Sequence, residues 1–153
     1  GHLVLSTLHT NDAPSAIPRL TDLGVEPYMV AATVEAVLAQ RLVRRICAEC
    51  RVRYAPDPAA VALLTGRPVG RVTLERGAGC SACRQTGFRG RTGIFELLVV
   101  TDSFKEALSR GADPARLRAI ALEDGLTTLR TDGWQKVEAG LTTIEEVLRV
   151  AGD

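Results

Sequence analysis

The sequence predicts an α/β fold with an inserted metal-binding lobe and a helical C-terminal subdomain. Three observations lead to this prediction. Residues 3–5 form an apolar run typical of a strand buried on both faces, two Cys-x2-Cys pairs lie in a segment rich in Gly and Pro, and residues 101–153 carry repeated helix-start signals. With 153 residues, the chain is long enough for one domain with a hydrophobic core and a small appendage.

The bulk composition is typical of a globular protein and gives no sign of a nucleic-acid or membrane partner. Hydrophobic residues make up 46% of the chain, charged residues 24%, and the net charge is +1. No apolar run reaches the roughly 20 residues that cross a bilayer, and no signal peptide is present. The chain starts without Met and directly in a strand-like run, so we expect it to be a fragment of a longer protein.

The first element is the predicted strand at Leu3–Leu5, which is followed by a polar stretch through Asp12. Either Asn11 or Asp12 is suited to cap the next helix, and Gly24 to end it. Pro18 is unfavourable beyond the first turn of a helix, so this helix is expected either to begin late, near Ser15, or to kink.

The next elements complete the predicted core. A helix from Pro27 to about Gln40 has little polar surface and should be buried. Residues 41–46 alternate as a strand, with Leu42 and Ile46 facing one side and Val43 the other. The predicted division is therefore a core segment at 1–46, a cysteine lobe at 47–92 with a short helix near 59–64, a returning strand at 93–100 and a helical subdomain at 101–153.

Four helices are predicted in the C-terminal subdomain from capping residues and terminating glycines. Their predicted N-caps are Thr101 or Asp102, Asp113, Thr127, and Thr142 or Thr143. Pro114 suits the first position of the second of these helices, and Glu145 and Glu146 suit the first turn of the last.

The four cysteines predict a structural metal site. Cys47 and Cys50 form one Cys-x2-Cys pair, and Cys80 and Cys83 form a second pair. Two such pairs supply the four thiolates of a closed tetrahedral zinc site, and the metal would stabilise a lobe with too little core to fold alone. Without a secretory signal, disulfides are disfavoured, and a redox role is disfavoured because thiol-exchange motifs occur singly.

Four stretches in this order resemble the secretion ATPase superfamily, the hexameric motors of type II secretion and type IV pilus assembly. They are GHLVLSTLHTNDA, VAATVEAVLAQRLVRRIC, CSACRQTGFRGRTGIFELL and LTTLRTDGWQKVEAGLTTIEEVLRV. The resemblance covers essentially the whole chain. It implies the C-terminal part of a RecA-like P-loop ATPase core, beginning just after Walker B, and the tetracysteine lobe points to the secretion and pilus-extension branch.

The resemblance also implies roles for individual residues. STLHTNDA is similar to the family's His box, which makes His9 a candidate sensor of the γ-phosphate or the attacking water. Arg41 is a candidate for approaching the nucleotide or a neighbouring subunit, with a surface ion pair as the alternative. The chain contains no G-x-x-x-x-G-K-[ST] motif, so we expect the fragment alone not to hydrolyse ATP.

The cofactors implied are Zn²⁺ in the lobe and ATP with Mg²⁺ in the full-length protein. The implied partners are further copies in a homo-hexamer and inner-membrane platform proteins, with a cytoplasmic location at that membrane. A stand-alone zinc-binding module that binds nucleic acid is the alternative, but only 4% of the residues are aromatic and no aromatic-basic interleaving occurs, so no nucleic-acid partner is expected.

Arginines concentrate on and beside the cysteine lobe. They form either a solvated face or a docking surface for an acidic partner or anionic lipid, and we expect Glu96 to pair with one of them. The residues of this arginine group are Arg44, Arg45, Arg51, Arg53, Arg84, Arg89 and Arg91.

Overall fold

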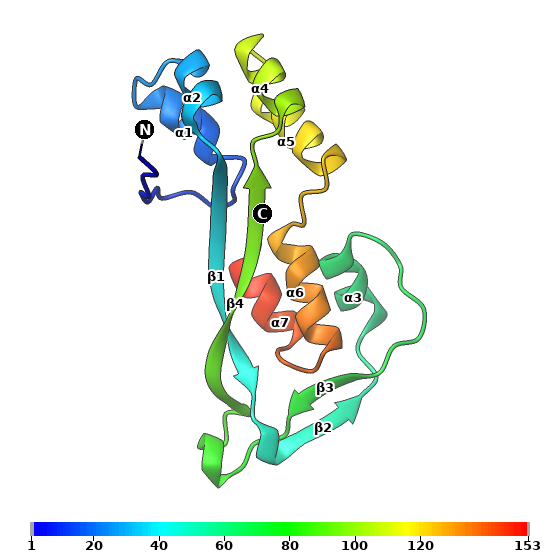
Figure 1. The fold of residues 1–153 in the computed structure, drawn as a ribbon. Coiled ribbons are helices and arrows are strands. Elements are labelled where there is room, and N and C mark those ends of the chain that lie inside the picture. The colour runs from blue at the N-terminus through cyan, green and yellow to red at the C-terminus, as the bar shows by residue number, and fades with distance from the viewer. Residues whose placement is uncertain (1, 153) are drawn as a thin grey trace. The chain divides into compact units, whose positions relative to one another are not determined.

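A computed structural model describes residues 2–152 and contains seven α-helices, two short 3₁₀ helices and four strands in that part of the chain (Figure 1). In chain order they are α1 (Ala16–Asp22), α2 (Pro27–Thr33), β1 (Ala36–Ile46), η1 (Ala48–Cys50), β2 (Arg51–Tyr54), α3 (Pro58–Thr65), β3 (Leu74–Gly77), η2 (Ser81–Cys83), β4 (Phe88–Val99), α4 (Asp102–Ser109), α5 (Pro114–Glu123), α6 (Leu129–Glu138) and α7 (Ile144–Val150). None of these helices is both long and apolar enough to cross a membrane.

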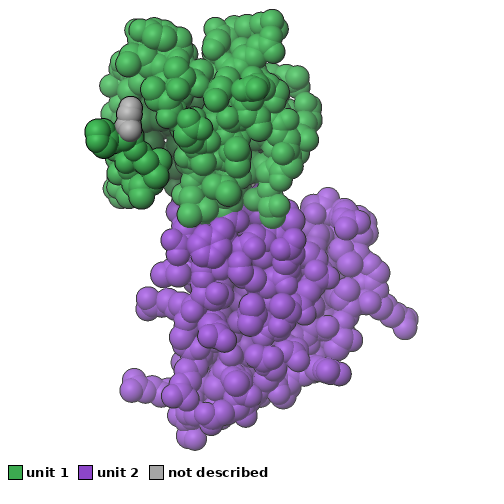
Figure 2. All heavy atoms as spheres, in the orientation of Figure 1, with its two compact units in different colours: residues 1–39, 96–127 green, residues 40–95, 128–153 purple. Residues whose placement is uncertain are grey.

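The chain divides into two compact units, which Figure 2 colours separately. Unit 1 comprises residues 1–39 and 96–127, and unit 2 comprises residues 40–95 and 128–153. Strands β1 and β4 pair with each other, and both contribute residues to each unit. This grouping differs from the division predicted from sequence, because the cysteine lobe shares a unit with α6 and α7.

Unit 1 is a small helical core around the end of β4. Its buried residues include Ile17 of α1, Val30 of α2, Leu98 of β4, Phe104 of α4 and Leu117 of α5. Helix α2 packs against α4, and α4 packs against α5. Each of these short helices has too little apolar surface to be stable alone, so packing in this core holds them in place.

Unit 2 has a second core, in which α3, α6 and α7 pack together. Val43 of β1, Leu64 of α3, Ile94 of β4, Val137 of α6 and Val147 of α7 are buried there. The antiparallel ribbon of β2 and β3 extends from this unit, with Arg51 opposite Gly77 and Tyr54 opposite Leu74. The cysteine lobe is therefore attached to a hydrophobic core formed partly by the C-terminal helices.

The predicted strand at Leu3–Leu5 is wrong for the described structure. These residues lie outside any helix or strand, and their exposed fractions are 85%, 79% and 88%. A strand buried on both faces needs neighbouring strands, and the sheets formed by residues 2–152 contain only β1 with β4 and β2 with β3. The apolar run correctly marks residues that favour burial, but no described element covers them.

The predicted long helix from Pro27 to Gln40 is also wrong in its second half. Helix α2 ends at Thr33, Val34 is already extended, and β1 begins at Ala36. The amide of Val100, just after β4, donates to the carbonyl of Glu35 at 2.9 Å. Pairing with β4 therefore outweighs the helical pattern, helped by the β-branched residues in this stretch.

The orientation predicted for β1 is only partly correct. Val43 is buried and Leu42 is half exposed, so these two residues face opposite sides as expected. Ile46, however, is buried like Val43, and its amide donates to the carbonyl of Leu141 in the segment before α7. A contact from the far end of the sequence thus decides the environment of Ile46.

The predicted helix starts agree well with the structure. Helix α1 begins at Ala16 after Ser15, which leaves Pro18 in the first turn, where it is tolerated. The short helix in the lobe is α3, and Thr101 and Asp113 cap α4 and α5 through their side chains. The N-cap of α6 is Thr128, one residue later than predicted. Thr143 precedes α7 as its N-cap without a side-chain capping bond.

Candidate functional site

The four cysteine sulfurs converge on one point in unit 2. Cys47 is the N-cap of η1 and Cys50 its last residue, while Cys80 is the N-cap of η2 and Cys83 its last residue, so each 3₁₀ turn carries two thiols. All four sulfurs lie within 4.8 Å of one another, and all four cysteines are free thiols. The structure therefore brings together the complete predicted ligand set from segments about thirty residues apart.

The separations between sulfurs fit a tetrahedral metal site. The Sγ atoms of Cys47 and Cys80 are 3.9 Å apart, those of Cys50 and Cys83 are 3.8 Å apart, and those of Cys80 and Cys83 are 3.7 Å apart. With zinc–sulfur bonds of about 2.3 Å, the edge of a regular tetrahedron is about 3.8 Å. These four residues could therefore hold a metal ion with little rearrangement.

Backbone amides stabilise the sulfurs. The amide of Gly79 donates to Cys50 Sγ at 3.3 Å, and the amides of Cys80 and Gly87 each donate to Cys83 Sγ at 3.2 Å. Such bonds neutralise part of the charge of a thiolate, which is the form that binds metals. These amide–sulfur hydrogen bonds could not be predicted from the sequence, because they depend on how the chain turns after each Cys-x2-Cys pair, here called a knuckle.

Gly77 and Gly87 allow two backbone segments of the cysteine lobe to approach each other closely. A Cβ atom on Gly77 would lie 2.0 Å from the carbonyl oxygen of Gly87, and a Cβ on Gly87 would lie 2.6 Å from that of Gly77. The carbonyl of Gly87 also accepts from the amide of Cys47 at 2.9 Å. Glycine is required here because a side chain would separate the two knuckles.

The thiols differ in acidity. Burial raises the pKa of Cys50 to about 11, against the opposing effect of the Gly79 amide. Burial also acts to raise the pKa of Cys83, but hydrogen bonds from the amides of Cys80 and Gly87 and from neighbouring thiols lower it to about 6. Of these two thiols, Cys83 is therefore the one whose environment favours the thiolate.

The lobe is fastened to the C-terminal helices through Arg44 at the end of β1. Its guanidinium lies 2.8 Å from Glu146 Oε1 and stacks over the ring of Phe88 at 4.3 Å. The carbonyl of Arg44 accepts from the Thr142 hydroxyl at 2.8 Å. Residues on β1, β4 and α7 thus meet at Arg44, three positions before Cys47 in the sequence.

His9 lies in an exposed segment of unit 1. Its side chain makes no hydrogen bond within residues 2–152, and residues 2–9 belong to no helix or strand. The polar residues that follow it form an ordered turn leading into α1. The Thr10 hydroxyl donates to the carbonyl of Asp12 at 3.0 Å, and Asp12 Oδ1 accepts from the amide of Ser15 at 2.8 Å. His9 is therefore displayed to solvent beside a fixed turn.

Arg41 lies on β1 in unit 2 and is half-buried. Its guanidinium Nη1 donates to the carbonyl of the neighbouring Gln40 at 3.2 Å. His9 and Arg41 thus belong to different compact units, whereas the four cysteines belong to one.

The arginine group near the lobe divides into paired and unpaired members. Arg44 pairs with Glu146, Arg51 with Glu75, and Arg89 with Glu49. Within the part of the chain that the structure describes, the exposed members without an ion pair are Arg45, Arg53, Arg84 and Arg91. A shallow groove of about 550 Å³ is lined by Arg44, Thr86, Phe88, Gly90 and Arg91.

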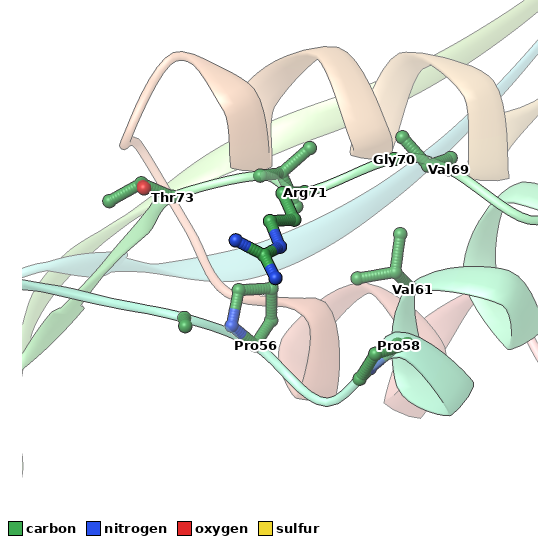
Figure 3. A pocket seen from close by; sticks show the side chains of 9 residues that line it. Pro56, Pro58, Val61, Val69, Gly70, Arg71 and Thr73 are labelled. Carbon is green, nitrogen blue, oxygen red and sulfur yellow. The ribbon is translucent and has the colours of Figure 1, made fainter.

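A second groove, of about 540 Å³, lies at the loop between α3 and β3 and is mostly apolar. Figure 3 shows Pro56, Pro58 and Val61 on one side and the loop bearing Arg71 on the other, with the guanidinium extending toward Pro56. None of the residues predicted to bind metal or nucleotide lines this groove.

Glu96 is a buried residue of unit 1, and its contact was not predicted from the sequence. Its side chain is only 2% exposed, and Oε1 accepts from the amide of Ala13 at 2.9 Å. The sequence analysis expected Glu96 to pair with an arginine beside the lobe, and it did not predict the contact with the Ala13 amide. No local signal pointed to a partner 83 residues away.

Comparisons with known proteins agree with the resemblance. The family model described as Type II/IV secretion system protein matches residues 1–149. The chain is 47% identical over 150 residues to the Type II secretion system protein E of Pseudomonas aeruginosa, covering 98% of this chain and 30% of that protein. It is 46% identical over 150 residues to the Type IV pilus assembly ATPase PilB of Thermus thermophilus, covering 97% of this chain and 17% of that protein.

A third relative is the Type II secretion system ATPase E of Vibrio cholerae, 42% identical over 151 residues, covering 98% of this chain and 30% of that protein. The chain thus spans less than a third of the length of these relatives. The match nevertheless runs through the polar segment at His9, both cysteine pairs and the C-terminal helices. We conclude that the chain belongs to the Type II/IV secretion system protein family.

Proposed function

We propose that the chain is the C-terminal part of a hexameric, RecA-like motor ATPase that drives type II protein secretion or type IV pilus assembly. The family match over residues 1–149 carries this proposal, supported by relatives named as ATPases of these two systems. The P-loop and the Mg²⁺ ligands would lie in the part of the motor that this chain does not span. Family membership favours this function over a stand-alone module that binds nucleic acid.

In this motor, His9 is the sensor of the γ-phosphate or the attacking water. Its exposed side chain has no competing partner within residues 2–152, and the turn that follows it is ordered by Asp12. A histidine on a fixed turn can bind phosphate oxygens without a large loss of conformational entropy. Arg41 supplies positive charge toward the nucleotide or a neighbouring subunit.

The cysteine lobe holds a structural Zn²⁺ through Cys47, Cys50, Cys80 and Cys83. The sulfur separations and the amide–sulfur bonds support this assignment, and four thiolates complete the preferred shell of zinc. When bound, the metal supplies cross-linking energy between the two knuckles rather than a reactive water, because no coordination position is left open.

The motor acts at the cytoplasmic face of the inner membrane, held there by platform proteins. The unpaired arginines near the lobe, Arg45, Arg53, Arg84 and Arg91, are suited to meet an acidic partner or anionic lipid headgroups. Such contacts would be weakened by salt because these side chains are exposed.

The experiment is steady-state ATP hydrolysis by the full-length motor carrying His9→Ala. A γ-phosphate contact strengthens in the transition state, so kcat should fall while nucleotide affinity changes little. His2→Ala is the matched control, because His2 is an exposed residue of the same segment. Unchanged turnover in the His9 variant would refute the sensor role. ATP turnover by the isolated chain at the rate of the intact motor would refute the proposal that the P-loop lies outside this chain.

A further inference from the structure

We infer that Glu96 and Arg118 are positioning residues that together clamp the turn after His9 and so fix where its imidazole points. This inference rests on the proposed sensor role of His9. The clamp consists of two side chains from the segment 96–127, and both hold the turn formed by residues 10–16. All of these residues belong to unit 1.

The first contact is a buried one. Glu96 extends inward from β4, and its Oε1 accepts the amide hydrogen of Ala13, which is itself fully buried. Ala13 lies at the point where the chain enters α1, and its carbonyl accepts from the amide of Ala16 at 3.1 Å. Without Glu96, the Ala13 amide would lose this charge-assisted partner in a place closed to bulk water.

The second contact is more exposed. Arg118, on α5, donates through Nη1 to Oδ2 of Asp12 at 2.9 Å. The other carboxylate oxygen of Asp12 accepts from the amide of Ser15, so one residue joins α5 to the start of α1. A small cleft of about 250 Å³ lies between the Asp12–Ser15 turn and the first turns of α5.

The two contacts hold the backbone but leave the His9 side chain uncovered. Ala13 is buried, Asp12 is partly buried and His9 is exposed, so the anchored end of the turn is covered while the imidazole of His9 is accessible. A histidine that touches a phosphate needs this combination of a fixed backbone and an accessible ring. Movement of β4 or α5 would shift the turn, and with it the position of His9.

The central test replaces the acceptor at position 96 in the full-length motor. Glu96→Met keeps an unbranched side chain of similar length but cannot accept the Ala13 amide, whereas Glu96→Gln retains an amide oxygen that can. We expect Glu96→Met to lower kcat by roughly tenfold or more with the KM for ATP little changed, because the sensor is displaced. Glu96→Gln should restore most of the activity.

Two further readouts separate positioning from a general loss of structure. Hydrogen–deuterium exchange should increase in peptides covering residues 10–16 in Glu96→Met but not in Glu96→Gln. In a double-mutant cycle, His9→Ala combined with Glu96→Met should be no slower than His9→Ala alone. Multiplied effects would mean that Glu96 acts independently of His9 and would overturn the inference.

Arg118→Gln provides a variant that should fold even if Glu96→Met does not, because its side chain is 44% exposed. It should lower kcat in the same direction, and again without further effect in the His9→Ala background. Arg116→Gln is the matched control, since Arg116 lies on the same helix and pairs with Glu123 at 3.4 Å instead. Equal activities of the Arg118 and Arg116 variants would overturn the role of Arg118.

The outcomes distinguish this inference from the proposed function. If His9→Ala leaves kcat unchanged, the sensor role itself fails. If His9→Ala lowers kcat while Glu96→Met and Arg118→Gln do not, the sensor role stands and only the clamp is refuted.

Discussion

The carboxylate of Glu146 on α7 accepts hydrogen bonds from both the backbone amide and the guanidinium of Arg44 on β1, at 2.9 and 2.8 Å. Arg149, one turn along α7, donates to the same carboxylate at 3.1 and 2.9 Å. Glu146 is 2% exposed, so nearly all of its hydrogen-bonding capacity is used within unit 2. Residues 102 positions apart in the sequence are thereby joined next to the cysteine lobe.

Glu146→Gln should destabilise unit 2 by about 2–4 kcal/mol, since a buried, fully bonded carboxylate is replaced by a neutral amide. The Arg44 and Arg149 side chains are 49% and 54% exposed and can return to water, which limits the loss. Urea unfolding followed by the fluorescence of Trp134, the only tryptophan, measures the change in unit 2. Glu145→Gln is the control because Glu145 is exposed on the same helix turn, and a cost as large as that of Glu146→Gln would contradict this account.

The free energy of unfolding should fall in acid over a defined range of pH. Burial acts to raise the pKa of Glu146, but hydrogen bonds from Arg149 and Arg44 lower it from 4.5 to about 2. The unfolded state therefore binds the proton first, and the stabilisation from Glu146 is complete above pH 4.5 and lost as the pH falls toward 2. Unfolding midpoints of wild type and Glu146→Gln should converge over this range, and parallel pH profiles would contradict the assignment.

Removing metal should loosen the cysteine lobe and leave the helical cores intact. Metal analysis under reducing conditions should find one zinc ion per chain, absent in Cys80→Ser. After chelation, hydrogen exchange should increase in η1, η2 and the β2–β3 ribbon, because the metal supplies their cross-link. Helix α3 should remain protected, since Val61 and Leu64 are buried against α6 and α7. Absence of metal in the wild type would contradict the tetrathiolate site.

Gly77→Ala should weaken metal binding by separating the two knuckles. The new Cβ would collide with the carbonyl of Gly87, whose amide supports Cys83, and backbone cannot move aside as a side chain can. We expect a stability loss of about 2–4 kcal/mol and weaker zinc retention in competition with a chelator. Gly70→Ala is the control, because its Cβ would meet no atom within 4 Å. Equal zinc retention by the two variants would rule out the close backbone approach.

The features that could be predicted from sequence depend on nearby residues. Thr101 caps α4 through the amide of Phe104, and Asp113 caps α5 through that of Arg116, each three residues away. The cysteine pairs are similar, because the two-residue spacing already determines that both thiols of a pair face one side. Such local signals do not depend on the tertiary contacts of the rest of the chain.

The features that could not be predicted depend on distant partners. Residues 36–40 form part of β1 rather than a helix because β4 lies beside them, and Leu3–Leu5 are exposed outside any helix or strand because no described strand pairs with them. The contacts of Glu96 with Ala13 and of Glu146 with Arg44 join residues 83 and 102 positions apart. The sequence analysis expected Glu96 to pair with an arginine near the lobe and placed Glu146 in the first turn of the last helix, but nothing local identified Ala13 and Arg44 as their partners.

The junction between Arg44 and Glu146 can form only late in synthesis on the ribosome, because Glu146 is translated 102 residues after Arg44. Every residue of unit 1 has been made once the chain reaches 127, whereas unit 2 lacks α6 and α7 until the last segment emerges. The cysteine knuckles are therefore translated long before the helices that complete the core beside them. Residues of β1 and β4 that pack in the core of unit 2 are therefore exposed until α6 and α7 are translated, a stage at which chaperone binding would matter most.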